Sequence, residues 1–106
     1  MKFQINSKEE LSAFIRVIQE ISLELEATLN KESDIFRRYE IAARIELLDD
    51  LLPKVMKKQF NQQSKTKIEI SKAMSIIIFQ YREIAVDIYA ELIKNRLVET
   101  IHKDMI

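Results

Sequence analysis

A Glu-x-x-His pair near the C-terminus, Glu99 and His102, carries the residue types best suited to chemistry in this chain. Three residues turn a helix by about 300°, so both side chains can face the interior of one bundle. Di-iron carboxylate bundles use this spacing, but they need two such motifs and further inward glutamates. The chain has one histidine, so a homodimer would have to supply the second motif. A solvated helix end is the plainer interpretation, and we expect no metal and no cofactor.

A second pattern pairs the same histidine with Arg96, which precedes it with five residues between them. The pattern is similar to the Arg-then-four-to-six-then-His signature of the HEPN family of helical ribonucleases. This two-residue resemblance implies a dimeric ribonuclease in which His102 is the acid or base and Arg96 stabilises phosphate charge. On a straight helix the two side chains point about 120° apart, which argues against a shared site. A ribonuclease or metal site built from Arg96, Glu99 and His102 is the second alternative for function.

Adjacent carboxylates occur at Asp49 and Asp50. Neighbouring helical residues diverge by about 100°, so the two carboxylates do not share a substrate atom. We expect them to cap a segment that starts near Pro53. No second acid–base partner for them is identifiable.

Lysines are concentrated in residues 54–72, which hold six basic residues and one acidic residue. With Phe60 and neighbouring amides, this segment could contact phosphates and a base. The basic residues are Lys54, Lys57, Lys58, Lys65, Lys67 and Lys72. A nucleic-acid-binding regulator is therefore the first alternative for function. The chain as a whole has 17 basic and 17 acidic residues and a net charge of zero, which argues against it.

The length and composition of the chain limit its number of domains and the kinds of chemistry that it can perform. A chain of 106 residues is sufficient for one domain, and we expect a single helical domain over residues 1–106. An apolar content of 47% is enough for a hydrophobic core. The chain contains no cysteine and no glycine. Disulfides, thiolate chemistry and glycine-rich phosphate loops are therefore excluded.

Membrane insertion and secretion are not expected. The first 11 residues include Glu9 and Glu10 and lack a continuous apolar run, unlike a secretory signal. The most apolar window, residues 73–93, contains four charged residues that would be costly at mid-bilayer: Arg82, Glu83, Asp87 and Glu91. We therefore expect a cytoplasmic protein.

Two long helices are expected in the N-terminal half, because glycine is absent and proline occurs once. Ser7 and Glu10 form a capping box that begins a helix over residues 8–29, and Asn30 is expected to end it in the left-handed conformation. Its apolar stripe is Leu11, Phe14, Ile15, Ile18, Ile21, Leu25 and Leu29. Ser33 or Asp34 would cap a second helix that kinks or restarts at Pro53. Its stripe is Ile35, Tyr39, Ala42, Ile45, Leu48, Leu52, Val55 and Met56.

The C-terminal half repeats the opening pattern of the chain. Residues 67–72 (Lys-Ile-Glu-Ile-Ser-Lys) echo residues 2–7 (Lys-Phe-Gln-Ile-Asn-Ser), with an apolar-polar-apolar triplet before a cap and a long helix. The triplets favour a two-stranded ribbon of residues 2–5 with 67–70. The alternative is that residues 67–72 form the first turn of the third helix. With that helix over residues 71–103, the fold class is all-α: an antiparallel bundle of three long helices.

The third helix is apolar around most of its circumference, since only six of the 21 residues in 73–93 are polar. Two partner helices cannot cover such a surface, so another subunit is expected to do so. The candidate interface residues are Ile76, Phe79, Val86, Tyr89, Ala90 and Ile93. The favoured function is a non-enzymatic interaction module that homodimerises through this helix, as a small adaptor, regulator or assembly factor. A heterologous protein partner stays open.

Overall fold

The computed structural model describes residues 2–58 and 66–104, with side chains described as far as Glu99. The described part is mostly helical and contains one small antiparallel sheet. The elements in chain order are β1 (Lys2–Ile5), α1 (Lys8–Lys31), α2 (Ile35–Met56), β2 (Thr66–Glu69), α3 (Lys72–Gln80) and α4 (Arg82–Asp104).

The capping box predicted at the start of α1 is confirmed, with one difference in its second bond. The Glu10 amide donates to Ser7 Oγ at 3.1 Å, as a capping box requires. The Glu10 carboxylate accepts from the Asn6 amide at 2.7 Å, one residue before the cap. Both bonds satisfy amides that no helical carbonyl can reach.

The end of α1 differs from the prediction. Asn30 lies inside the helix, and none of the described residues has a positive φ. The helix ends at Lys31, after which Glu32 is extended. Arg38 Nη1 donates to the carbonyl oxygens of Leu29 and Glu32, both at 2.8 Å. The guanidinium thus takes up one carbonyl of the last turn and that of the cap residue, a role that a left-handed residue after the helix often serves.

Helix α2 begins as predicted and continues to Met56, the last residue of the predicted stripe, without a break. Asp34 is its cap, and its carboxylate accepts from the Phe36 amide at 2.9 Å. The helix passes through Pro53 to Met56, so the predicted restart is wrong, and Asp49 and Asp50 lie within the helix and cap nothing. A kink at Pro53 stays a prediction.

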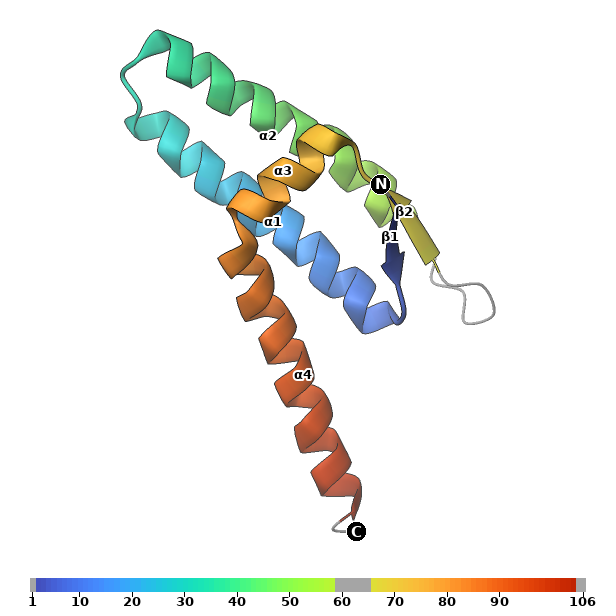
Figure 1. Ribbon diagram of the computed structural model, residues 1–106. Helices are drawn as coiled ribbons and strands as arrows, with labels where there is room; N and C mark the ends of the chain where they lie inside the picture. Colours follow the sequence, from blue (N-terminus) through green and yellow to red (C-terminus); the bar gives the residue numbers. More distant parts are fainter. Residues whose placement is uncertain (1, 59–65, 105–106) are drawn as a thin grey trace.

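The buried face of α2 also differs from the predicted stripe. Its buried residues are Ile41, Leu48, Leu51 and Val55, whereas Ile35, Tyr39, Ala42 and Met56 are exposed. Each turn of a helix can bury only the side that another element covers. Near its start α2 faces only the end of α1, because α3 crosses the other half of the helix pair (Figure 1).

The two-stranded ribbon is confirmed, one residue earlier in its second strand than predicted. β1 and β2 pair antiparallel, and Phe3 is opposite Ile68. The interpretation of residues 67–72 as the first turn of a helix is therefore wrong. Ile5 and Ile68 are buried, and the Phe3 ring stacks on the Phe14 ring of α1 at 5.0 Å. The ribbon is thus attached to α1 by side-chain packing, as an isolated pair of strands requires.

The single helix predicted over residues 71–103 is wrong, because the chain turns at Tyr81. Tyr81 leaves helical geometry (φ −108°, ψ 29°) and separates α3 from α4. Met74 and Ile77 of α3 and Ile88 of α4 all belong to the same buried core. The turn allows both segments to reach that core, which a straight helix of this length could not do.

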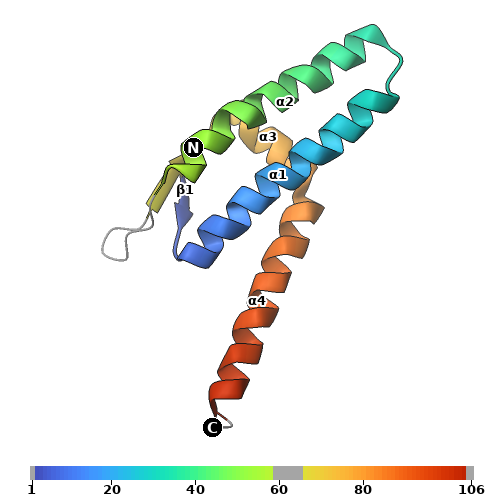
Figure 2. The same ribbon diagram turned by 180° about the vertical axis from the view of Figure 1, so that it is seen from behind.

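The four helices form an open arrangement in place of the predicted three-helix bundle. α1 and α2 lie side by side as an antiparallel pair, and α3 crosses this pair (Figures 1 and 2). α4 packs against α1 with its first half, and both views show its C-terminal end running away from the pair. No helix within the described residues is long and apolar enough to cross a membrane.

Candidate interaction surface

One face of α4 packs on α1 and belongs to the core. Ile88 is buried there, and Ile84, Ala85 and Leu92 are partly buried against the same core. Two ion pairs flank this contact. Arg16 Nη1 lies 3.5 Å from Glu91 Oε2, and Arg96 Nη2 lies 3.8 Å from Glu10 Oε1. The first half of α4 therefore has a defined position against α1.

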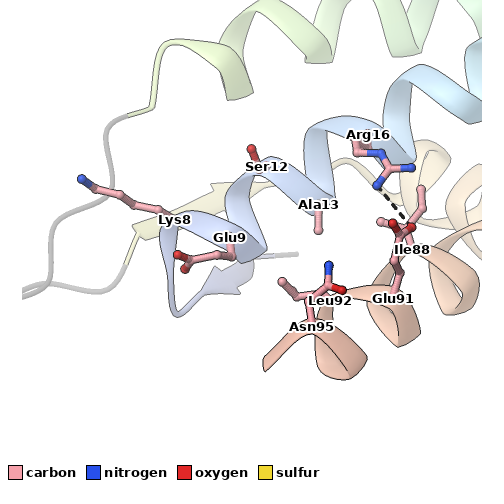
Figure 3. A pocket seen from close by; sticks show the side chains of 9 residues that line it. All are labelled: Lys8, Glu9, Ser12, Ala13, Arg16, Ile88, Glu91, Leu92 and Asn95. Atoms are coloured by element: carbon pink, nitrogen blue, oxygen red, sulfur yellow. Dashed lines mark ion pairs between the residues drawn. The ribbon is translucent and has the colours of Figure 1, made fainter. Parts of the chain in front are cut away.

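A groove of about 370 Å³ with both polar and apolar lining residues follows this contact on one side. Figure 3 shows Lys8, Glu9 and Ser12 of α1 on one wall and Glu91 and Asn95 of α4 on the other. The Arg16–Glu91 ion pair spans the two helices at one end of the groove (Figure 3). Both partners of this ion pair are exposed, and exposed pairs stabilise a protein only weakly.

The opposite face of α4 is apolar and exposed to solvent. We define the outer seam of α4 as Val86, Ala90, Ile93 and Leu97. Val86, Ile93 and Leu97 are 62%, 55% and 59% exposed, and Ala90 is also exposed. At about 100° per residue, these four positions centre roughly 180° from Ile84, Ile88 and Leu92. α4 therefore has two apolar faces, of which the chain itself covers one.

The outer seam follows the spacing of a coiled-coil contact. Its residues are separated by four, three and four positions, which is the a/d pattern that helices use to pair along their length. The same spacing runs back through Glu83 to Phe79 and Ile76 in α3, and both of these apolar residues are exposed. Because the chain turns at Tyr81, this agreement in sequence spacing does not place Ile76 and Phe79 on the same helical face as the outer seam.

An apolar groove of about 670 Å³ lies beside the seam, between β1, α1, α3 and α4. Phe3, Phe14, Ile70, Ile76, Phe79 and Tyr89 are among its lining residues. The Arg82 guanidinium lies 4.8 Å from the centre of the Phe79 ring and Arg82 Nη1 donates to the Phe79 carbonyl at 3.3 Å. Contacts with Phe79 of the same chain therefore hold the Arg82 cation at the rim of the apolar groove.

Tyr89 lines the apolar groove and carries a buried hydroxyl. Among the described residues its hydroxyl has no hydrogen-bond partner. Burial raises the pKa of Tyr89 above its ordinary value of 10.0, and the nearby Glu10 carboxylate raises the pKa further. Both effects disfavour the phenolate, so the side chain is neutral at neutral pH.

The structure exposes five of the six predicted interface residues. Ile76, Phe79, Val86, Ala90 and Ile93 are exposed, and Tyr89 is half-buried. Sequence reasoning missed Leu97, although the regular spacing of the seam could have found it. It also missed four exposed apolar side chains elsewhere: Leu23 in α1, and Ile35, Phe36 and Tyr39 near the start of α2.

The predicted basic segment is divided among three elements. Lys54 lies in α2, Lys67 in β2 and Lys72 at the start of α3, while Lys57 and Lys58 directly follow α2. All five are exposed, and Lys65 lies outside the described residues. The end of α2, β2 and the start of α3 lie near one another (Figures 1 and 2).

The residues of the second alternative are only partly described. Arg96 donates to Ser7 Oγ at 2.9 Å and pairs with Glu10, so it is engaged at the start of α1. Glu99 is exposed, and the His102 side chain lies outside the described residues. Among the residues that the structure describes, no group of three His, Asp or Glu side chains could hold a metal ion.

The molecule has more surface than a compact protein of its mass. Its radius of gyration is 16.3 Å, against about 13 Å for a compact chain of this length. Its accessible surface is 8023 Å², about 1,800 Å² above the roughly 6,200 Å² typical of a 12.6 kDa monomer. A stable dimer needs to bury about 800 Å² per subunit. The surplus reflects the open arrangement of the helices, which leaves surface available for contact with another molecule.

Comparisons with protein-family models, with curated proteins and with solved structures find no match to this chain.

Proposed function

We propose that this protein is a non-enzymatic interaction module that homodimerises through α3 and α4, as a small adaptor, regulator or assembly factor. The observation that carries the proposal is the outer seam of α4. A helix that is apolar on two opposite faces is stable in water only if both faces are covered. The chain covers one face with α1 and leaves the other exposed.

The energetic case rests on the size of the exposed side chains. Complete burial of a large apolar side chain contributes about 1.5–3 kcal/mol. Ile76, Phe79, Val86, Ile93 and Leu97 each leave half or more of their surface exposed. Exposed apolar residues are common singly, but a continuous set marks an interaction site. A second copy presents the same apolar surface, and self-complementary contacts are the usual basis of homodimers.

Sedimentation equilibrium at micromolar concentration tests the proposal. We expect the wild-type protein to sediment at about twice its monomer mass of 12.6 kDa. A monomer throughout this range would overturn the proposal. Ile93→Asp places a charge in the outer seam and should produce a monomer. Phe36→Asp is the matched control, because Phe36 is 81% exposed at the far turn between α1 and α2; this variant should remain a dimer.

A second candidate function is a nucleic-acid-binding regulator that uses Lys54, Lys57, Lys58, Lys67 and Lys72. Its support is that these exposed lysines come from three segments that lie near one another. Such contacts would be electrostatic, so binding should weaken steeply as salt rises. Absence of binding to duplex or single-stranded DNA and RNA at low salt would contradict this candidate.

A further inference from the structure

We infer that the two α4 helices of the dimer lie antiparallel, with their outer seams in contact and the two-fold axis between Glu91 and Leu92. This inference rests on the proposed function, because it assumes that a second copy covers the seam. It adds the orientation, the register and the residues that determine both.

Side-chain size supports the antiparallel register. In this register Ala90 lies against Ile93 of the partner subunit, and Val86 lies against Leu97 of the partner subunit. Each layer then combines a smaller and a larger side chain, which fills space at the density of a protein core. A parallel pair would place Ala90 against its own copy and leave a gap beside the larger Ile93 layer.

Glu83 provides a second argument, because it occupies the seam position one turn before Val86 and is exposed. In a parallel pair the two Glu83 carboxylates would face each other across the interface, where like charges repel. In the antiparallel register the two carboxylates lie about 25 Å apart along the axis, at 1.5 Å per residue. The single acidic residue of the seam therefore disfavours the parallel orientation.

The charges that flank the seam provide a third argument. Asp87 and Lys94 lie on the same side of the seam, and both are exposed. In the antiparallel register Asp87 of each subunit lies beside Lys94 of the partner subunit, so the dimer has two such attractive pairs. A parallel pair would instead bring Asp87 to Arg82 of the partner subunit. Arg82 is already held over the Phe79 ring and donates to the Phe79 carbonyl.

Disulfide trapping tests the orientation, because the wild-type chain contains no cysteine and cannot form background crosslinks. The two variants Val86→Cys and Leu97→Cys are made singly and together in one chain. A disulfide requires Cα atoms within about 7 Å. In the antiparallel register each introduced cysteine lies about 16 Å along the axis from its own copy, at 1.5 Å per residue. In the double variant, the side chain introduced by Val86→Cys instead lies against the one introduced by Leu97→Cys in the other subunit.

The expected result is that only the double variant forms a covalent dimer on oxidation, with a disulfide between positions 86 and 97 mapped by mass spectrometry. Efficient crosslinking of either single variant would overturn the antiparallel orientation. No crosslinking of any variant, with dimers still present in sedimentation, would overturn the seam as the contact while leaving homodimerisation intact. If the wild-type protein sediments as a monomer, the proposed function itself is overturned.

A charge exchange gives an independent readout in the cysteine-free protein. Asp87→Lys should weaken dimerisation about 4- to 30-fold, because two attractive pairs become repulsive. Adding Lys94→Asp to the same chain should restore the wild-type dissociation constant in the antiparallel register. In a parallel pair the double variant would keep the new lysine beside Arg82 and would stay weakened. Persistence of the weakening would therefore contradict the inference.

Discussion

Tyr89 combines a half-buried ring with a hydroxyl that finds no hydrogen-bond partner among the described residues. A buried hydroxyl without a partner loses its hydrogen bonds to water and destabilises the folded state. Tyr89→Phe removes that group and keeps the ring, so we expect unfolding to require about 1 kcal/mol more free energy. Urea unfolding at neutral pH, monitored by circular dichroism, measures the difference. A clear loss of stability would show that the hydroxyl has a partner.

The raised pKa of Tyr89 predicts a dependence of stability on alkaline pH. The unfolded chain releases the phenolic proton near pH 10.0, whereas the folded protein retains it to higher pH. The unfolded state therefore binds fewer protons above this pH, and stability falls as pH rises from about 10 through the folded pKa. Tyr89→Phe lacks this contribution. The stability difference between wild type and variant should be constant below about pH 10 and should shift against the wild type above it.

Ser7 connects two segments that are distant in sequence. Its Oγ accepts from the Glu10 amide within α1 and also from Arg96 of α4. Ser7→Ala removes the cap and the contact with Arg96, and we expect a loss of about 1–2 kcal/mol. Ser12→Ala is the matched control, because Ser12 is exposed on the same helix and should leave stability nearly unchanged. Equal midpoints of urea unfolding for the two variants would contradict the prediction.

At the scale of elements, Pro53 interrupts the hydrogen bonding of α2 without ending the helix. Proline has no amide hydrogen, so the carbonyl of Asp49 loses its helical partner. Pro53→Ala restores this donor at an exposed position, and we expect an increase in stability of about 1–3 kcal/mol. Asp50→Ala, also exposed in α2, is the control and should change stability little. A destabilised Pro53→Ala protein would indicate that the proline-specific bend is needed for packing.

The elements differ in how readily the sequence alone predicts them. The start of α1, the cap of α2 and the β1–β2 ribbon follow from local patterns, because a capping residue or an alternating triplet acts within a few positions. The break at Tyr81 has no such pattern, since neither glycine nor proline is near it. It arises because α3 and α4 must contact the same core from different directions, which is a property of the assembled helices.

At the scale of the whole molecule, stability should depend on protein concentration. Dimerisation stabilises only the folded state, so the Tm of the wild-type protein should rise as concentration rises. Ile93→Asp removes the contact in the outer seam, and its Tm should be independent of concentration. Calorimetry over a hundredfold range, about 1–100 µM, measures both behaviours. A wild-type Tm that does not change with concentration would count against dimerisation.

The sequence predicted the apolar character of the candidate surface, but not the exposure of every individual side chain. Residues 73–93 contain too few polar residues to form the whole solvent-facing side of a helix, and five of the six side chains predicted there as an interface are exposed. Sequence spacing could not predict that Tyr89 is half-buried, because its burial depends on where α1 lies. It also could not place Ile35 and Tyr39 at the surface, because their exposure depends on how far α3 extends along α2.

By itself the sequence indicated the helical class, the N-terminal caps of α1 and α2 and the excess of apolar surface, and it offered the ribbon as one of two alternatives, because these features depend on the chemistry of neighbouring residues. Only the tertiary structure decided which face of each helix is covered. That choice depends on the angles at which helices cross and on where the chain turns, and contacts between residues distant in sequence determine both. The exposed seam of α4 is the result of that choice.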